Sequence, residues 1–329
     1  MNIVGIERIT YGVADVPLAV RFQKDWGFDC VEEGSTGAEF RLLNDTQVHI
    51  RRADDGALPP ARIDWDVPHR GSTAREVVWG VADAATLEAI GAEMTKDREV
   101  RRDNRGMLHT TDDDGYHIAF TVTERKKLRF EATAVNTVDN FARLNRPADG
   151  TVLRRVGPSR MGHVVYWSPK DFRKSAEFYL KRLGFRLTDD MGKGGLFMRC
   201  AGASDHHTLL LQSHGPAYGF QHVAYEFKDF DEVMLLGCQV EKGGWKTNVG
   251  PLRHNVSSSM SWYIWNPAGG LSEAFSDMDE VDDNWVVRHF RPGEDPSFYG
   301  SSWRARPEQA GVGPATWKDE HTAPAFPKA

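Results

Sequence analysis

The chain has 329 residues, of which 40% are hydrophobic and 27% are charged, with a formal net charge of −6 and an isoelectric point near 6.1. This length is enough for two domains with sizeable cores, and the composition is ordinary for a soluble globular protein. The mildly acidic balance gives no reason to expect a nucleic-acid partner, and no apolar run approaches the ~20 residues that a membrane span needs.

The N-terminus enters a strand-like pattern at once, without a basic segment followed by an apolar core, so no signal peptide is expected. Cys30, Cys200 and Cys238 are odd in number and form no CxxC pair. Reduced thiols in a cytoplasmic protein are the simplest interpretation of this pattern.

In the first half, residues 15–28 predict a helix, with an acidic cap, an early proline and Gly27 as its end. A strand that begins at Trp79 passes through Asp83 into a second helix, and residues 112–120 predict a closing strand. Weak periodicity and many turn formers follow, and they predict a linker, with a short helix within it as one option.

The second half repeats this design. Residues 168–185 predict a helix with Ser168 as its N-cap and Gly184 as its end. A second strand passes through Asp229 into a helix, and residues 267–275 correspond to the closing strand of the first half.

Three corresponding pairs occur in the same order with a nearly constant offset, which makes coincidence between generic strand–helix units improbable. They predict an α+β fold in which four βαβββ modules form two repeated domains. The modules are expected to start near residues 6, 75, 161 and 220. The expected parts of the chain are a first domain at 1–130, a linker at 131–158, a second domain at 159–278 and a C-terminal segment at 279–329.

The C-terminal segment is rich in turn formers, yet it contains five large aromatic residues, which are Trp285, Phe298, Tyr299, Trp303 and Trp317. So many aromatic side chains indicate that the segment packs on the rest of the molecule as a flap or an interface arm. The alternative is a tail that wraps the surface and has no role in a site.

Glu273 occupies a position where a carboxylate is costly. Leu271, Glu273 and Phe275 share one face of a predicted strand, because strand side chains alternate between faces. An ionised carboxylate on a buried apolar face needs a partner or a metal. His163 and His222 lie in the strands that open the third and fourth modules, and two His with one carboxylate leave open positions on Fe(II) for substrate and oxygen.

The first half does not reproduce this set of residues. At the corresponding positions, the offsets place Arg8, Glu76 and Ile118. Arginine cannot ligate a cation and isoleucine has no donor atom. The sequence therefore predicts one metal site per chain, in the second half.

The chain resembles the type I extradiol ring-cleavage dioxygenases of the vicinal oxygen chelate superfamily, such as catechol and 2,3-dihydroxybiphenyl dioxygenases. The resemblance covers about residues 5–278, and its most specific part is a signature ending at the metal-binding Glu. The residues that match the signature are His254, Tyr263, Asn266, Pro267, Gly269 or Gly270, and Glu273. Trp262 and Leu252 depart from the pattern, which bears on pocket shape more than on the metal.

The resemblance implies a glyoxalase-like fold in which His163, His222 and Glu273 bind Fe(II), with Mn(II) less expected. It also implies roles near the metal for His207, His254 and Tyr263. His207 would be the acid–base catalyst, while its neighbour His206 would point to solvent.

The resemblance further implies cleavage of a catechol ring beside its vicinal diol with O2, in the degradation of aromatic compounds, and it makes a homo-oligomer expected. Two alternatives stay open. One is another enzyme of the superfamily, a lyase or isomerase that uses Mn, Zn or Ni. The other is a non-enzymatic protein that binds a small molecule on the same fold.

Overall fold

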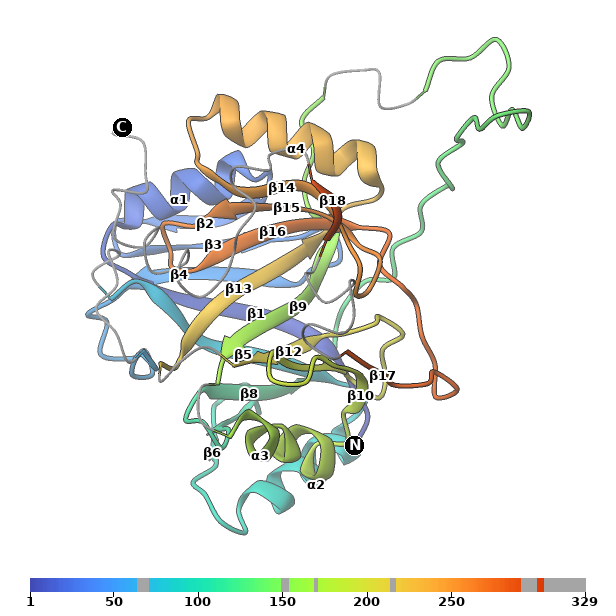
Figure 1. Ribbon diagram of the computed structural model, residues 1–329. Helices are drawn as coiled ribbons and strands as arrows, with labels where there is room; N and C mark the ends of the chain where they lie inside the picture. The colour runs from blue at the N-terminus through green and yellow to red at the C-terminus, as the bar shows by residue number, and fades with distance from the viewer. Residues whose placement is uncertain (64–70, 149–153, 169–170, 214–216, 291–300, 305–329) are drawn as a thin grey trace.

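The computed structural model describes residues 1–63, 71–148, 154–168, 171–213, 217–290 and 301–304, and it contains two large mixed sheets and a few helices (Figure 1). The first sheet consists of β1 (Ile3–Val13), β2 (Asp29–Gly34), β3 (Gly37–Arg41), β4 (Gln47–Arg52), β5 (Thr73–Val81), β6 (Arg101–Arg102), β7 (Leu108–Thr111) and β8 (His117–Val122). Its strand order is β2-β3-β4-β1-β5-β8-β7-β6.

The second sheet is formed by the second half of the chain and by two short strands from the C-terminal segment. Its strands are β9 (Arg160–Trp167), β10 (Arg186–Asp190), β11 (Gly195–Arg199), β12 (Leu209–Gln212), β13 (Gly219–Glu226), β14 (Thr247–His254), β15 (Met260–Trp265), β16 (Leu271–Ser276), β17 (Arg288–His289) and β18 (Ser301–Arg304). Their order is β17-β10-β11-β12-β9-β13-β16-β15-β14-β18.

The two sheets share one internal plan. In the first, β1 pairs with β4 in parallel and with β5 antiparallel, and β5 pairs with β8 in parallel. In the second, β9, β12, β13 and β16 repeat these three pairings in the same sense. β1, β5, β9 and β13 each open a strand–helix–strands unit, so the predicted α+β fold of four βαβββ modules is confirmed.

The helices are α1 (Val16–Asp25), α2 (Ala84–Met94), α3 (Phe172–Glu177), the π-helical turn η2 (Phe178–Arg182) and α4 (Phe230–Lys242). The carboxylates of Asp15, Asp83 and Asp229 cap α1, α2 and α4 by accepting a backbone N–H from the first turn, as the sequence predicts. Within the described residues, no helix combines the length and the apolar character that crossing a bilayer requires.

The cap of α3 differs from the prediction. Asp171, not Ser168, accepts the N–H of Lys174, at 3.2 Å. The hydroxyl of Ser168 instead donates to Asp114 of the first half, at 2.6 Å. Because that hydroxyl is used by a contact between the halves, the helix begins at the next residue that can cap it. Gly184 follows η2 with φ +77°, in agreement with its predicted role as a stop.

The two halves bury aromatic side chains against each other in a shared core. Trp26 packs edge-on against Tyr225 at a centroid distance of 5.4 Å, and Tyr116 stacks on Tyr166 at 4.2 Å. Such aromatic pairs add to the stabilisation that their buried area supplies. The second sheet is thus held against the first by packed side chains in addition to the covalent linker.

The linker leaves the sheets as a projecting loop (Figure 1). Its described residues contain no helix, so the short helix considered for it is absent from 131–148. Thr137 and Asn140 form an isolated antiparallel bridge. Val138 and Leu144 are 91% and 81% exposed, which leaves apolar side chains at the tip without cover in the single chain.

The C-terminal segment lies against the second sheet through its described part. β17 pairs in parallel with β10, and β18 pairs antiparallel with β14. The indole of Trp285 donates to the carbonyl of Thr188 at 3.0 Å, and Phe290 is buried beside Val165 and other side chains of the sheet. Phe298, Tyr299 and Trp317 lie outside the described residues.

Candidate metal centre

Three adjacent strands of the second sheet place His163, His222 and Glu273 together. His163 on β9 pairs with Ala224 on β13, and Ala224 pairs with Glu273 on β16. His222 precedes Ala224 by two residues, so it lies on the same face. β9 and β13 are rich in β-branched and aromatic residues, which favour strands in this buried position.

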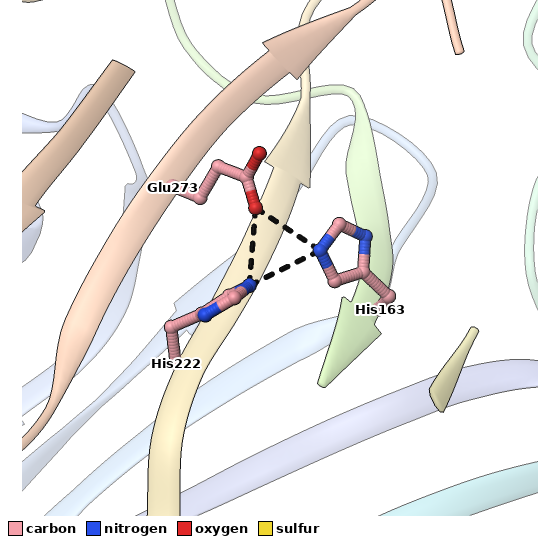
Figure 2. A group of neighbouring side chains, drawn as sticks. All are labelled: His163, His222 and Glu273. Carbon is pink, nitrogen blue, oxygen red and sulfur yellow. Dashed lines mark hydrogen bonds and ion pairs between the residues drawn. The ribbon is translucent and has the colours of Figure 1, made fainter. Parts of the chain in front are cut away.

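The three side chains meet at one point in front of the sheet (Figure 2). His163 Nε2 lies 3.0 Å from Glu273 Oε2, His222 Nε2 lies 3.1 Å from the same oxygen, and the two nitrogens are 3.1 Å apart. Ligands about 2.1 Å from an octahedral ion at right angles to one another would lie about 3.0 Å apart. The triangle therefore matches one face of an octahedron, and these residues fit a divalent metal.

The protonation states also suit a metal. Burial raises the pKa of Glu273, but the neighbouring His163 and His222 outweigh it and hold that pKa well below its usual range. Burial is the largest cause that lowers the pKa of His222, to about 4, so its imidazole is neutral at pH 7. His222 Nδ1 contacts the amide oxygen of Gln221, which accepts its proton in a hydrogen bond. The lone pair of the neutral ring is then on Nε2, where it can bind a metal.

The structure corrects one of the three counterparts assigned in the first half. Arg8 and Glu76 correspond to His163 and His222, as predicted. The counterpart of Glu273 is Ala119, not Ile118, because Ala119 pairs with Val78 as Glu273 pairs with Ala224. Ile118 points to the opposite face and is buried in the main core. Alanine has no donor atom either, so the first half still lacks the triad.

Ion pairs occupy the corresponding place in the first half. Arg8 Nη2 lies 3.7 Å from Glu76, and His109 Nδ1 lies 2.7 Å from the other oxygen of that carboxylate. Burial opposes the charge of His109, but Glu76 and Asp103 outweigh it and raise the pKa of His109. In the described part of the chain, His163, His222 and Glu273 are the one group of three ligand-type side chains whose donor atoms lie within 4.8 Å of one another.

A cavity of about 220 Å³ opens on the triad. Apolar cavities of about 150 Å³ are large enough to bind benzene. The cavity has room for one aromatic ring with substituents. Its apolar wall includes Trp167, Phe197, Leu210, Val249, Leu252 and Leu271.

His207 lies at this cavity beside the triad. Its ring packs on that of His163 at a centroid distance of 4.1 Å. Burial is the largest cause that lowers the pKa of His207 well below its usual value, and His163 adds to it. A neutral imidazole in this position can accept a proton from a bound ligand.

His254 and Tyr263 line the cavity on the other side of Glu273. His254 Nε2 lies 2.9 Å from the Tyr263 hydroxyl and 3.8 Å from Glu273 Oε1. The Tyr263 ring packs edge-on against His222 at 5.3 Å. Burial raises the pKa of Tyr263 well above its usual value, so the phenol keeps its proton and can donate it in a hydrogen bond. The structure thus brings all six predicted site residues to one cavity.

The prediction for His206 is wrong. Its side chain is fully buried, with Nε2 2.9 Å from Asp189 and Nδ1 3.2 Å from Nδ1 of His207. The expectation of a solvent-facing His206 assumed strand alternation through 206 and 207. The strand β12 begins only at Leu209, so alternation does not apply to the two histidines.

Several polar side chains at the cavity were not predicted. They are Gln212, Gln221, Asn248, Ser257 and Ser259. The sequence contains one indication for Gln221, because it directly precedes the predicted ligand His222 in the same strand. The others lie at strand ends and in a loop, where no periodicity shows which way a side chain points.

Residues 160–273 match the model of the Glyoxalase/Bleomycin resistance protein/Dioxygenase superfamily. The chain is also 32% identical over 129 residues to metapyrocatechase 2 of Cupriavidus necator. That alignment covers 39% of this chain and 40% of the relative. Both matches support the predicted resemblance to this superfamily.

Solved structures extend the similarity of fold to nearly the whole chain. The Mn(II)-bound glyoxalase from Novosphingobium aromaticivorans has a TM-score of 0.72 and 21% identity, with 94% of each chain covered. Homoprotocatechuate 2,3-dioxygenase from Arthrobacter globiformis has a TM-score of 0.68 and 18% identity, with 94% of this chain and 91% of that chain covered. The predicted glyoxalase-like fold is confirmed.

Proposed function

We propose that this protein is an extradiol dioxygenase that cleaves a catechol-type ring beside its vicinal diol. Both atoms of O2 enter the product, a ring-opened semialdehyde or keto acid. The observation that carries the proposal is the buried triangle of His163, His222 and Glu273 beside a cavity of about 220 Å³. The partial match to a metapyrocatechase supports the same chemistry.

Fe(II) is the metal we propose, with Mn(II) as the less expected substitute. Two imidazoles and one carboxylate are the ligand set of non-haem Fe(II) oxygenases, and they leave open positions for substrate and oxygen. When bound, the ion would supply a positive charge that lowers the pKa of a catechol hydroxyl and a site where O2 is activated. Glu273 contributes the negative charge that helps to retain it.

The side chains around the triad would hold and orient the diol. The phenol of Tyr263 and the imidazole of His254 lie beside Glu273, where they can hydrogen-bond the substrate oxygens. The apolar wall would pack on the ring, which favours an aromatic ligand over a small polar one. Orienting both diol oxygens toward one point reduces the entropic part of the barrier.

His207 is the residue we propose for proton transfer. It is neutral because it is buried, so it can accept a proton from a substrate hydroxyl at the start of the reaction. It can return that proton when the ring opens. No protein group beyond His207, His254 and Tyr263 is needed in this account of the reaction.

The test is an assay with catechol and 3-substituted catechols, after anaerobic reconstitution with Fe(II), Mn(II) or Zn(II). We expect turnover with Fe(II), uptake of one O2 per ring opened and a yellow product. Equal activity without oxygen, or with Zn(II) alone, would contradict the dioxygenase and favour the lyase or isomerase alternative. Full ligand binding without metal would favour a non-enzymatic binding protein.

The cytoplasmic location and the homo-oligomeric state expected from the sequence remain predictions. So do the domain boundaries near residues 130 and 159, and the role of the C-terminal segment as a flap or an arm.

A further inference from the structure

His206 is a buried histidine that the proposed reaction does not use. Its side chain is fully enclosed between Phe197 and Trp285, with both ring-centroid distances 5.7 Å and near-perpendicular packing against Trp285. Both of its ring nitrogens have close contacts. Nε2 lies 2.9 Å from Asp189 Oδ2 and, more distantly, 3.4 Å from Arg288 Nη2, and Nδ1 lies 3.2 Å from Nδ1 of His207.

Asp189 is held as an acceptor. It is fully buried on β10, and Arg288 of β17 donates to it from Nε and Nη2 and from its backbone N–H. Burial opposes the charge of Asp189, but the hydrogen bonds from His206 and Arg288 outweigh it and keep the pKa of Asp189 below its usual value. A carboxylate accepts hydrogen bonds and donates none.

These contacts decide which nitrogens carry protons. Since Asp189 only accepts, the proton between it and His206 lies on His206 Nε2. Arg288 already matches the charge of Asp189, so no second cation is needed there, and a neutral His206 has a lone pair on Nδ1. The short contact between the two Nδ1 atoms is a hydrogen bond only if His207 Nδ1 carries the proton. Its Nε2, on the opposite side of the ring, is left with a lone pair.

We propose that Arg288, Asp189 and His206 form a positioning chain that fixes the ring orientation and the Nδ1–H tautomer of His207. The lone pair of His207 Nε2 is thereby reserved for a ligand in the cavity. Arg288 belongs to the C-terminal segment, so this segment contributes to the site from behind the catalytic histidine. The consequence for catalysis rests on the proposed function, whereas the tautomer itself does not.

The tautomer can be measured without activity. In protein labelled with [15N]histidine and loaded with diamagnetic Zn(II), two-bond proton–nitrogen correlation separates protonated from unprotonated ring nitrogens. The His207 signals are assigned by their loss in His207→Gln. We expect Nδ1 to be protonated and Nε2 unprotonated. A proton on Nε2 of His207 in the wild type would overturn the proposal.

Two substitutions of His206 provide a matched pair. In His206→Gln, the amide oxygen can accept from His207 and the amide nitrogen can donate to Asp189, so the tautomer should be retained. His206→Leu fills a similar volume but has neither group, so the His207 signals should become a mixture of tautomers. If both variants gave the wild-type tautomer, the chain would not be what fixes it.

Steady-state kinetics with Fe(II) and catechol then tests the consequence. We expect His206→Leu to lower kcat by roughly tenfold to a hundredfold with little change in KM, and His206→Gln to stay close to wild type. Arg288→Met, nearer the surface, supplies the same comparison if His206→Leu does not fold. A wild-type protein with the expected tautomer but no oxygen uptake would refute the proposed function and leave the positioning chain standing. Equal kcat in Leu and Gln variants would refute the kinetic role.

Discussion

The two halves of this molecule differ more in a few side chains than in their folds. Both halves present the same face of three adjacent strands, yet one face carries His163, His222 and Glu273, and the other carries Arg8 and Glu76 beside alanine. A guanidinium repels a cation, while a neutral imidazole binds one. The chemistry of the site is therefore decided by side chains that the repeat does not conserve between halves.

The first prediction compares the two acidic residues. Glu273→Ala should empty the metal site, because two imidazoles without the carboxylate lose the charge that retains the ion. Glu76→Ala should leave one metal per chain, since Glu76 pairs with Arg8 and His109. Metal content by inductively coupled plasma mass spectrometry checks both. Two metals per wild-type chain, or loss only in Glu76→Ala, would show that the halves are assigned wrongly.

The second prediction concerns His207. His207→Phe should keep the metal, because no ligand atom is removed, but should slow ring cleavage by ~10²-fold or more if His207 transfers the proton. Single-turnover kinetics and metal analysis on the same sample separate the two effects. Lost metal would make His207 a ligand or a structural residue, and wild-type turnover would remove it from the reaction.

At this scale the sequence predicts which side chains meet at the candidate metal site better than it predicts their surroundings. His163 and His222 stand at corresponding strand positions, where alternation dictates the face, so the triad is predictable. The error at Ile118 is a slip of one residue, and such a slip moves a side chain to the opposite face. The orientation of His206 depends on an irregular segment held by Asp189, a residue 17 positions away, and no local pattern encodes that contact.

Among the elements, the turn between β7 and β8 joins the halves through two buried carboxylates, which contact residues at the end of β9, in α3 and in η2. Asp112 accepts from the hydroxyl of Tyr179 at 2.6 Å, and Asp114 accepts from Ser168 and Ser175, each at 2.6 Å. The sequence predicts the helix but assigns Ser168 to its cap. A prediction from local spacing cannot know that a carboxylate of the other half requires that hydroxyl.

The third prediction follows from Asp112. Burial is the largest cause that raises the pKa of Asp112, from 3.8 to about 7. A carboxyl with a raised folded-state pKa binds its proton more tightly when folded, so its stabilising share is full below about pH 4 and is lost as pH rises toward 7. The stability of Asp112→Asn relative to wild type should therefore increase as the pH rises from 5 to 8.

Between pH 5 and pH 8, the difference in free energy of unfolding between Asp112→Asn and wild type should change by about 1 kcal/mol or more, since each tenfold shift in proton affinity is worth about 1.4 kcal/mol. Melting temperatures of both proteins at several pH values from 5 to 8 measure it. Asp15→Asn serves as the control for an aspartate-to-asparagine change, because asparagine also caps a helix well. A difference between Asp112→Asn and wild type that is constant across this range would contradict the assignment.

For the whole molecule, the shared core implies that neither half is an independent body in this chain. Trp26, Phe22 and Tyr116 of the first half pack on Tyr225, Trp245 and Tyr166 of the second. The sequence predicts the repeat, because each module keeps its own helix caps and strands. It does not predict how one half docks on the other, because aromatic residues in a strand do not show which residues they will contact.

The projecting linker is the feature of the whole molecule that bears on the expected homo-oligomer. Val138, Phe141 and Leu144 are 91%, 68% and 81% exposed. The side-chain amide of Asn136 bonds the backbone N–H and C=O of Arg143, which fixes the shape of the tip. Exposed apolar groups on a preformed structure are typical of protein–protein contacts.

The last prediction is that the triple variant Val138→Ser, Phe141→Ser and Leu144→Ser lowers the oligomeric mass, because the apolar area that would be buried between copies is removed. Light scattering after size-exclusion chromatography measures this mass. Metal content and melting temperature should change little, since the tip contributes nothing to the shared core. Leu43→Ser, at another exposed apolar residue, is the matched control and should keep the wild-type mass. A monomeric wild type would refute the expected oligomer, and an unchanged mass in the triple variant would place the contact elsewhere.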